Sequence, residues 1–245
     1  MTARSDFAIA ASARAGLDRA ALEEIARWLG ATAHHGRPLP ADRPVLVFNA
    51  NEVRLFAPGR KPAAWHPGMA HRRLHLDRDP LAAAIDLRPG ETVVDATLGL
   101  GHDALLLAAA GAEVLAIERE APLLYFTLGG LAAYRPDLAR RIRAVRAEHA
   151  EWLAAAPAAA VDHVYFDPMF PRARAGDSVT WGTLRAVAEP GARLPAPLLR
   201  EALRVARRTV SLKLAPGERP PVADDVPPAR VEGSKRVHFA VWDAG

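Results

Sequence analysis

The sequence contains no cysteine among its 245 residues. Disulfide bonds, zinc–thiolate sites and catalysis by a thiol nucleophile are therefore excluded. The nine histidines show no HExxH or comparable ligand spacing, so we expect no metal site. These absences remove whole classes of competing chemistry.

Long hydrophobic runs are also missing. No stretch reaches the roughly 18 apolar residues that a membrane-spanning helix needs. The amino-terminal segment places Asp6 before a short apolar run and lacks the uncharged core of a secretory signal. We therefore expect a cytoplasmic protein with no membrane partner.

The composition is that of a globular chain, with 50% hydrophobic and 24% charged residues. The formal net charge is +4 and the isoelectric point is near 9.9, so arginine carries most of the excess. This balance is a mild indication of a polyanionic partner, because a GC-rich coding bias would supply the same arginines and alanines.

Two regions are predicted: a small α+β subdomain over residues 1–70 and a larger domain over residues 71–245. The first contains an apolar run at 7–11, a helical pattern at 17–29 and two apolar runs around Asn49, Ala50 and Asn51. The turn residues between those two runs predict a β-hairpin.

From Pro80 onward, helical and strand patterns alternate as in doubly wound α/β folds. The pattern predicts strands at 92–95, 113–117, 142–147, 163–167 and 209–214, and helices at 81–85, 103–110, 122–133 and 150–155. Two strand candidates, 229–231 and 237–242, follow with no helix between them. They predict an antiparallel hairpin that closes the sheet.

The stretch VVDATLGLGHDA, residues 93–104, places a glycine loop between a strand ending at Asp95 and a helix beginning near His102. Gly99 and Gly101 allow a ligand to approach the backbone closely, which suits a nucleotide-like ligand. The stretch also matches the dinucleotide-binding pattern G-x-G-x-x-G/A, in which Glu118 would accept hydrogen bonds from ribose hydroxyls. Asp95 would disfavour a pyrophosphate and suits the cationic end of S-adenosylmethionine (SAM). A glycine turn needed only for packing is the remaining alternative.

A second motif, DPMFP at residues 167–171, ends another buried strand. Ligands of open α/β sheets lie at the carboxyl ends of the strands, so Asp95, Glu118 and Asp167 should converge on one crevice. Asp167 and the carbonyl of Pro168 can accept N–H bonds from an exocyclic base amine, and Phe170 can stack on the base. The alternative is a proline-stiffened strand end with Phe170 in the core.

The motifs DATLGLGHDA, AIERE and DPMFP resemble, in order and spacing, those of class I SAM-dependent methyltransferases. Together with MAHRR at residues 69–73 they resemble the RsmJ family, which methylates the N2 amine of a guanosine in 16S ribosomal RNA. The likeness covers roughly residues 69–242. It implies a Rossmann-like, mostly parallel seven-stranded sheet with a final antiparallel hairpin, SAM as cofactor, and small-subunit RNA or the 30S particle as partner.

The resemblance also implies roles for individual residues. The implied cofactor contacts are His102, Asp103, Glu118, Arg119, Glu148, His149 and Asp167, although the chain departs from the family at 102, 148 and 149. It places MAHRR near the substrate. The candidate phosphate contacts are Arg72, Arg73 and Arg172, each of which can equally belong to a solvated face.

Two other functions stay open at this point. A degenerate methyltransferase fold can serve as a non-catalytic RNA-binding scaffold, and an enzyme of the same fold can act on a protein or small-molecule amine. The lack of cysteine excludes an RNA cytosine-C5 methyltransferase, which attacks the ring with a thiolate.

Overall fold

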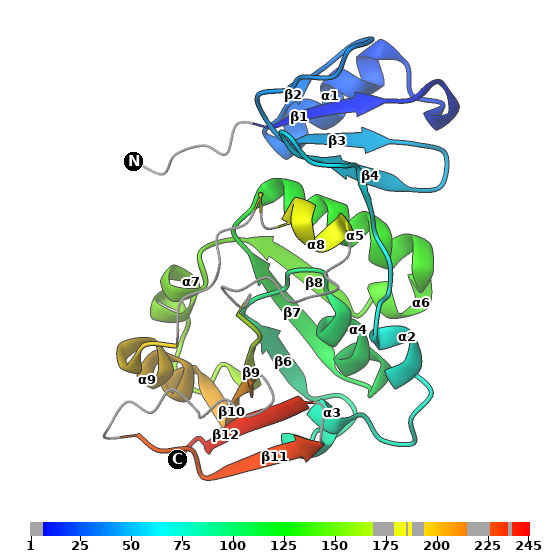
Figure 1. The fold of residues 1–245 in the computed structure, drawn as a ribbon. Coiled ribbons are helices and arrows are strands. Elements are labelled where there is room, and N and C mark those ends of the chain that lie inside the picture. Colours follow the sequence, from blue (N-terminus) through cyan, green and yellow to red (C-terminus); the bar gives the residue numbers. More distant parts are fainter. Residues whose placement is uncertain (1–6, 169–178, 185, 188–193, 215–225, 235–236) are drawn as a thin grey trace. The chain divides into compact units, whose positions relative to one another are not determined.

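The computed structural model describes residues 7–168, 179–184, 186–187, 194–214, 226–234 and 237–245 (Figure 1). This part of the chain forms two compact units. The first combines the amino-terminal residues up to His66 with a helix from the middle of the chain, and the second contains most of the remainder.

The first unit contains a five-stranded sheet with the order β2-β1-β3-β4-β5. Its strands are β1 (Ala8–Ala11), β2 (Thr32–Ala33), β3 (Val45–Phe48), β4 (Val53–Phe56) and β5 (Ala63–Ala64), and helix α1 (Arg19–Leu29) lies between β1 and β2 in the chain. Strands β3 and β4 pair antiparallel, with Val45 opposite Phe56. The predicted hairpin is therefore confirmed.

Helix α5 (Ala121–Tyr134) belongs to this first unit, although it follows a strand of the large sheet in sequence. Gly129 and Gly130 let it approach β4 and the segment after β5 closely. A Cβ atom on Gly130 would overlap the Trp65 ring, and one on Gly129 would lie 2.9 Å from Val53 Cγ2. Helix α8 (Val179–Leu184) also joins this unit. The expected division at residue 70 did not anticipate these two helices.

The second unit contains a seven-stranded sheet with the order β11-β12-β10-β9-β6-β7-β8. The strands are β6 (Thr92–Asp95), β7 (Glu113–Glu118), β8 (Ile142–Arg146), β9 (Val161–Phe166), β10 (Ala206–Leu214), β11 (Arg230–Ser234) and β12 (Val237–Asp243). The first five pair in parallel, whereas β12 pairs antiparallel with both β10 and β11. The predicted α/β fold with a mostly parallel sheet and an antiparallel carboxyl-terminal hairpin is confirmed.

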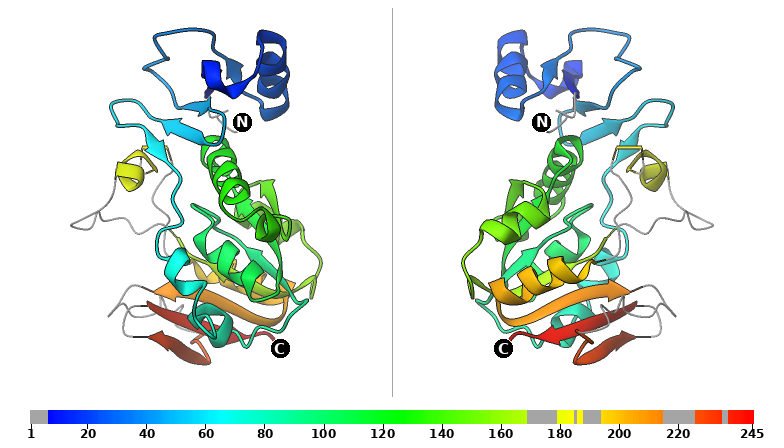
Figure 2. Two further views of the ribbon diagram at one scale, coloured as in Figure 1. Left: turned by 90° about the vertical axis from the view of Figure 1, so that its right-hand side faces the viewer. Right: turned by 90° about the vertical axis from the view of Figure 1, so that its left-hand side faces the viewer.

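Helices flank this sheet (Figure 2). Helix α4 (His102–Ala109) packs against β7 and β8, and α9 (Ala196–Val205) packs against β9 and β10. Helix α7 (His149–Ala155) contacts α9, while α2 (Ala70–Arg73), α3 (Pro80–Ala84) and α6 (Pro136–Ala139) contact α4. Helix α9 was not predicted from the sequence. No helix of the described chain is long and apolar enough to cross a membrane.

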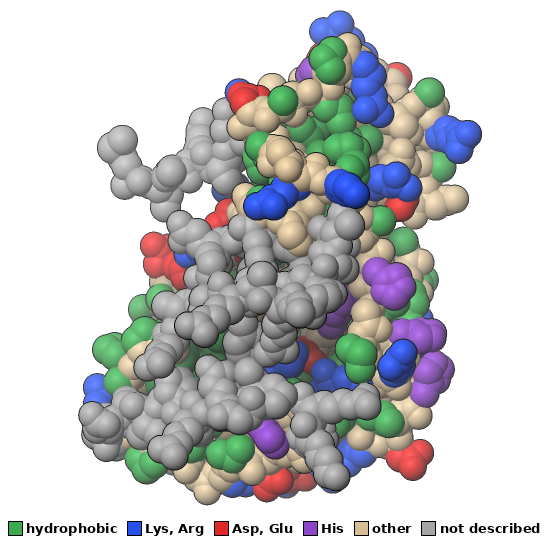
Figure 3. Space-filling model, in the orientation of Figure 1, with side chains coloured by type: hydrophobic (Ala, Val, Ile, Leu, Met, Phe, Trp, Pro, Cys, Tyr) green, Lys and Arg blue, Asp and Glu red, His purple; other side chains and the backbone are tan. Residues whose placement is uncertain are grey.

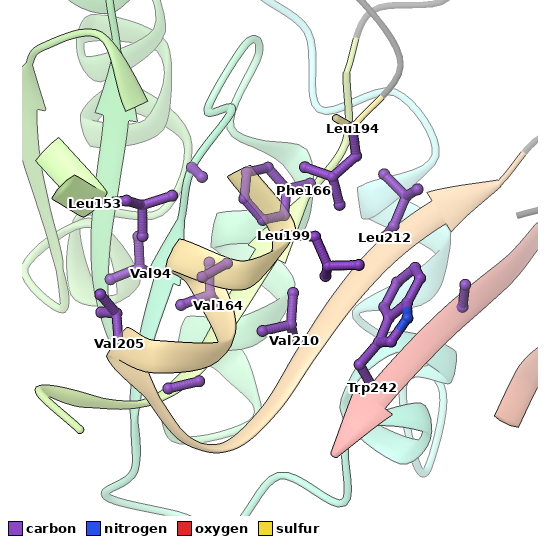
Figure 4. Close-up of a cluster of buried hydrophobic side chains, with 14 of the residues drawn as sticks. Val94, Leu153, Val164, Phe166, Leu194, Leu199, Val205, Val210, Leu212 and Trp242 are labelled. Atoms are coloured by element: carbon purple, nitrogen blue, oxygen red, sulfur yellow. The ribbon is translucent and has the colours of Figure 1, made fainter. Parts of the chain in front are cut away.

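One face of the sheet is apolar (Figure 4). Val164 and Phe166 of β9 pack with Val210 and Leu212 of β10 and with Leu199 of α9 in one buried cluster. Because successive strand residues point to opposite faces, the residues between them point the other way. In β10 those residues are Thr209, Ser211 and Lys213, so the opposite face carries polar side chains.

Candidate active site

The predicted acids lie at one edge of the seven-stranded sheet. Asp95 ends β6, Glu118 ends β7 and Asp167 directly follows β9. These strands are neighbours, with Asp95 opposite both Tyr165 of β9 and Ala116 of β7. Since all three strands run parallel, their carboxyl ends meet at the same edge.

The glycine loop between β6 and α4 is held by two of these acids. Gly99 and Gly101 have φ values of +52° and +68°, in the left-handed region that favours glycine. The Thr97 amide donates to Asp95 Oδ1 at 3.1 Å, and the Gly99 amide donates to Glu118 Oε2 at 3.1 Å. Glu118 therefore fixes the loop as well as ending β7.

Asp103, in the first turn of α4, is the centre of a buried polar network. Its Oδ1 accepts from Arg73 Nη1 at 2.6 Å, and its Oδ2 accepts from the Tyr165 hydroxyl at 2.8 Å and from Lys213 Nζ at 2.7 Å. Burial alone would raise its pKa, but the charges of Lys213 and Arg73 hold the pKa of Asp103 below its ordinary value. Both carboxylate oxygens of Asp103 therefore accept hydrogen bonds from other side chains of the protein.

Arg73, one of the expected phosphate contacts, is engaged by two carboxylates. Its Nε and Nη2 each donate to Asp79 at 2.8 Å, and Asp79 Oδ1 also accepts from the Leu81 amide at the start of α3. The side chain is 14% exposed, and its guanidinium lies between Asp79 and Asp103. These two carboxylates would compete with an RNA phosphate for Arg73.

Arg72 differs from its neighbour because its side chain is exposed. His71 and His75, also exposed, flank it in sequence, and their rings lie 5.5 Å apart. Figure 3 shows histidine side chains gathered on the right of the molecule, where Figure 1 places α2. Of the MAHRR arginines, Arg72 is therefore the one that a large ligand can reach.

Lys213 connects the Asp103 network to Asp167. Its Nζ donates to Asp167 Oδ2 at 2.8 Å, and the Asp167 amide donates to the Thr97 hydroxyl at 2.6 Å. Burial raises the pKa of Asp167, the ammonium of Lys213 opposes that rise, and the charge of Asp103 adds to it. The net result is a pKa above the ordinary value.

Carboxylates outnumber cations in this carboxyl-end cluster, which we define as Asp79, Asp95, Asp103, Asp167, Arg73 and Lys213. Burial, reinforced by the charges of Asp103 and Asp167, raises the pKa of Asp95 to about 8. No salt bridge to Asp95 is found among the described residues. A cationic ligand such as the ammonium or sulfonium group of SAM would favour the charged form of Asp95, whereas a pyrophosphate would raise its pKa further.

The remaining predicted contacts lie around this edge. Glu148, after β8, pairs with His149 at 3.0 Å and with Arg119 at 3.4 Å. Burial lowers the pKa of His149, whose ring meets Phe166 edge-on. The His102 ring lies against Gly68, where a Cβ atom would come within 2.8 Å of it.

Other predicted residues divide into two groups. Pro168 is described and half-buried directly after Asp167. Phe170 and Arg172 lie outside the described residues. Among the residues that are described, no group of three or more His, Cys, Asp or Glu side chains is arranged to hold a metal ion.

The site also contains residues that the motifs did not predict: Lys213, Tyr165 and Asp79. The signal for the first was the alternation TVSLKL in β10, which places Lys213 on the polar face. Tyr165 of β9 lies two residues before Asp167, so the same alternation places their side chains on the same face of the sheet. Asp79 precedes Pro80 as the amino-terminal cap of α3, a pattern with no link to the site in sequence.

Comparison with known proteins agrees with this architecture. The family model described as "Putative SAM-dependent methyltransferase" matches residues 64–243. A ribosomal RNA small subunit methyltransferase J of Thioalkalivibrio sulfidiphilus is 35% identical over 188 residues, covering 73% of this chain and 72% of that protein. The enzyme of the same name from Laribacter hongkongensis is 43% identical over 51% of this chain and 49% of that protein. In such alignments the chain spans about half the length of the relative.

A solved structure gives the same fold. A SAM-dependent methyltransferase of Neisseria gonorrhoeae superimposes with a TM-score of 0.70 at 22% sequence identity, covering 97% of this chain and 96% of that one. The match of the family model to most of the chain confirms the resemblance drawn from DATLGLGHDA, AIERE and DPMFP, and SAM is the cofactor of this family. The chain belongs to the SAM-dependent methyltransferase family.

Proposed function

We propose that this chain transfers a methyl group from SAM to the exocyclic N2 amine of a guanosine in small-subunit (16S) ribosomal RNA. The observation that carries the proposal is the pair of incompletely neutralised acids, Asp95 and Asp167, at the carboxyl ends of adjacent strands. The names of the relatives support the choice of RNA, and a ribosomal substrate agrees with the predicted cytoplasmic location.

Asp95, Gly99, Gly101 and Glu118 form the cofactor side in this proposal. The glycines let SAM approach the backbone closely. Glu118 accepts hydrogen bonds from the ribose hydroxyls of SAM, and Asp95 faces its amino-acid end. His102, Arg119, Glu148 and His149 line the periphery of the same site. When bound, SAM supplies an electrophilic methyl group on its sulfonium.

Asp167 and Pro168 form the acceptor side. The carboxylate of Asp167 and the Pro168 carbonyl accept the N–H groups of the target amine, which favours a nitrogen whose lone pair points at the methyl group. As the C–N bond forms, the bond from the methyl carbon to the sulfonium sulfur would break and leave a neutral thioether, and the amine would lose a proton to Asp167 or to water. Phe170 is proposed to stack on the guanine, and its ring would add about 1 to 3 kcal/mol of binding.

Arg72 and Arg172 are proposed to hold RNA phosphates. Replacing Arg72 with Ala should lower RNA affinity and reduce the slope of log K against log salt by about one charge, because one counterion fewer is released. Arg143→Ala, which removes an exposed arginine from β8, controls for the change in net charge. An unchanged slope for Arg72→Ala would assign that residue to a solvated surface.

The test of the function is a comparison of substrates. Purified protein with methyl-labelled SAM should transfer label to small-subunit RNA or 30S particles, and mass mapping of nucleosides should find N2-methylguanosine that disappears when the gene is deleted. Labelling of protein, or of small amines, would favour the second kind of enzyme. SAM binding without any transfer would favour a non-catalytic scaffold.

A further inference from the structure

Lys213 lies outside both chemical motifs and yet contacts the acids of both. Its Nζ lies 2.7 Å from Asp103 Oδ2, after the glycine loop, and 2.8 Å from Asp167 Oδ2, in DPMFP. The lysine side chain is 22% exposed and its pKa is raised by these two carboxylates, although burial acts in the opposite direction. Lys213 is therefore a charged lysine that links two separate parts of the site.

The Asp103 end of this link is fixed. Arg73 Nη1 and the Tyr165 hydroxyl occupy the same carboxylate, and Arg73 is in turn held by Asp79 in a two-point contact. Side chains from four elements, α2, α4, β9 and β10, therefore meet at Asp103. The Lys213 ammonium thus contacts this network through Asp103 and reaches Asp167 with the same Nζ.

The charges around Asp167 give Lys213 a second effect. Asp95 faces Asp167 from β6 and Asp103 faces it from α4, whereas Lys213 of β10 is the cation in contact with it in the described chain. Tyr165, on the same strand as Asp167, donates to Asp103. Without Lys213, three carboxylates would face one another with Arg73 as the remaining cation, and it touches Asp103 rather than Asp167.

We propose that Lys213 is a positioning residue for methyl transfer, holding the Asp167 carboxylate in place and in its charged form while tying it to the helix that follows the glycine loop. This inference rests on the proposed role of Asp167 as acceptor of the target amine. The competing possibility is that Lys213 only neutralises Asp103 and stabilises the fold. A measurement on Asp167 itself separates the two.

The experiment compares three variants of the full chain. Lys213→Met removes the charge at similar length, Lys213→Arg keeps it, and Arg207→Met removes a cation from the opposite end of the same strand, where it pairs with Asp162. The ¹³C carboxyl signal of Asp167, assigned by its loss in Asp167→Asn, is followed against pH without cofactor or RNA. Single-turnover methyl transfer to small-subunit RNA at saturating SAM is then measured over the same pH range.

We expect Lys213→Met to raise the titration midpoint of Asp167 by about one pH unit or more, because an opposite charge in direct contact shifts a pKa by that amount. The acidic limb of the rate profile should move upward equally, so that transfer below the midpoint falls about tenfold and recovers at high pH. Lys213→Arg should keep both midpoints near the parent values, and Arg207→Met should change neither. Circular dichroism checks folding, and Lys213→Gln replaces Lys213→Met if the latter does not fold.

Each other outcome has a definite meaning. An unchanged Asp167 midpoint in Lys213→Met overturns the inference whatever the substrate. A raised midpoint with an unmoved rate profile overturns a role for Lys213 in transfer. If Asp167→Ala keeps full transfer while the midpoint still rises in Lys213→Met, the proposed role of Asp167 fails and the electrostatic contact stands.

Discussion

The two ends of the seven-stranded sheet carry polar clusters of opposite character on the same strands. At the carboxyl ends, β6, β9 and β10 contribute to the carboxyl-end cluster, in which Asp95 has no salt-bridge partner among the described residues. At the amino ends, the same strands contribute to an amino-end cluster, which we define as Asp86, Glu91, Asp162, His163, Arg207 and Arg208. There, each carboxylate has an arginine partner.

Every side chain of the amino-end cluster contacts another member of the cluster. Glu91 accepts from Arg208 at 2.6 Å and contacts His163 Nε2 at 3.0 Å, while His163 Nδ1 contacts the Thr209 hydroxyl at 2.8 Å. Burial acts to raise the pKa of Glu91, yet the bonds from His163 and the charge of Arg208 leave that pKa lowered. The pKa of Asp162 is lowered in the same way, by bonds from Thr92 and Arg207.

This difference separates a structural role from a binding role. At the amino ends every acid of the cluster contacts an arginine and has a lowered pKa, so folding favours the charged acids. At the carboxyl ends burial and mutual repulsion raise the pKa values of Asp95 and Asp167, and a cationic ligand would stabilise their charged forms. Changing one acid at each end of the same strand tests this distinction directly.

The largest effect is expected on the rate of methyl transfer, when substitutions at the two ends of β9 are compared. Asp167→Ala and Asp167→Asn should slow single-turnover methyl transfer at saturating SAM by about 100-fold or more, because neither side chain can take the amine proton. Asp162→Asn, at the amino end of β9, should leave the rate near that of the parent. Transfer by Asp167→Ala within about threefold of the parent would contradict the proposed mechanism.

The two ends of β7 should differ in cofactor affinity. Glu118→Ala should weaken SAM binding by about ten- to a hundredfold, or about 1.5 to 3 kcal/mol, since a carboxylate acceptor and the tie to Gly99 are both lost. Glu113→Ala removes an exposed acid at the amino end and serves as the control. Calorimetry gives both dissociation constants, and equal values would remove Glu118 from the site.

The two ends should also respond oppositely in stability. Because the folded-state pKa of Asp95 is about 8, the folded protein retains a proton there that the unfolded chain loses above about pH 4. Its contribution therefore becomes less favourable as the pH rises from 4 to 8. Asp95→Asn should raise the free energy of unfolding by about 2 kcal/mol at pH 8 and by less at pH 5.

Asp162→Asn is the matched comparison in denaturant unfolding. It should lower the free energy of unfolding at pH 8, because it removes an acid whose folded-state pKa is depressed and which is present in its charged form above about pH 4. A lower free energy of unfolding in both Asp95→Asn and Asp162→Asn would show that the charged form of Asp95 stabilises the fold, as that of Asp162 does.

The smallest effect concerns His163, at the amino end of β9. Burial lowers its pKa despite the contact with Glu91, so folding favours the neutral ring. Its contribution is complete above the unfolded pKa of about 6.5 and is lost as the pH falls below that value. Between pH 7 and pH 5 the parent should lose about 1 kcal/mol more than His163→Gln in urea unfolding. His75→Gln, which changes an exposed histidine, should behave like the parent.

The strands of the large sheet were predictable from sequence because their signals are local. Apolar runs bounded by turn residues located β6 at the observed Thr92–Asp95 and the other strands within a few residues. Helix α9 was missed, and the membership of α5 in the first unit was not foreseen. That membership depends on the fit of Gly129 and Gly130 against Val53 and Trp65, which are distant in sequence.

The sequence by itself determined the chemical inventory: a chain without thiols, acids at three strand ends, and a glycine loop whose residues need positive φ. Which acids are neutralised was decided only by the tertiary structure. Lys213 meets Asp103 across 110 residues, and Tyr165 meets it across 62, because β10 lies beside β9 and β9 beside β6. Strand order and side-chain alternation together set these contacts, so the same Asp-to-Lys spacing in another sheet order would leave the charges apart.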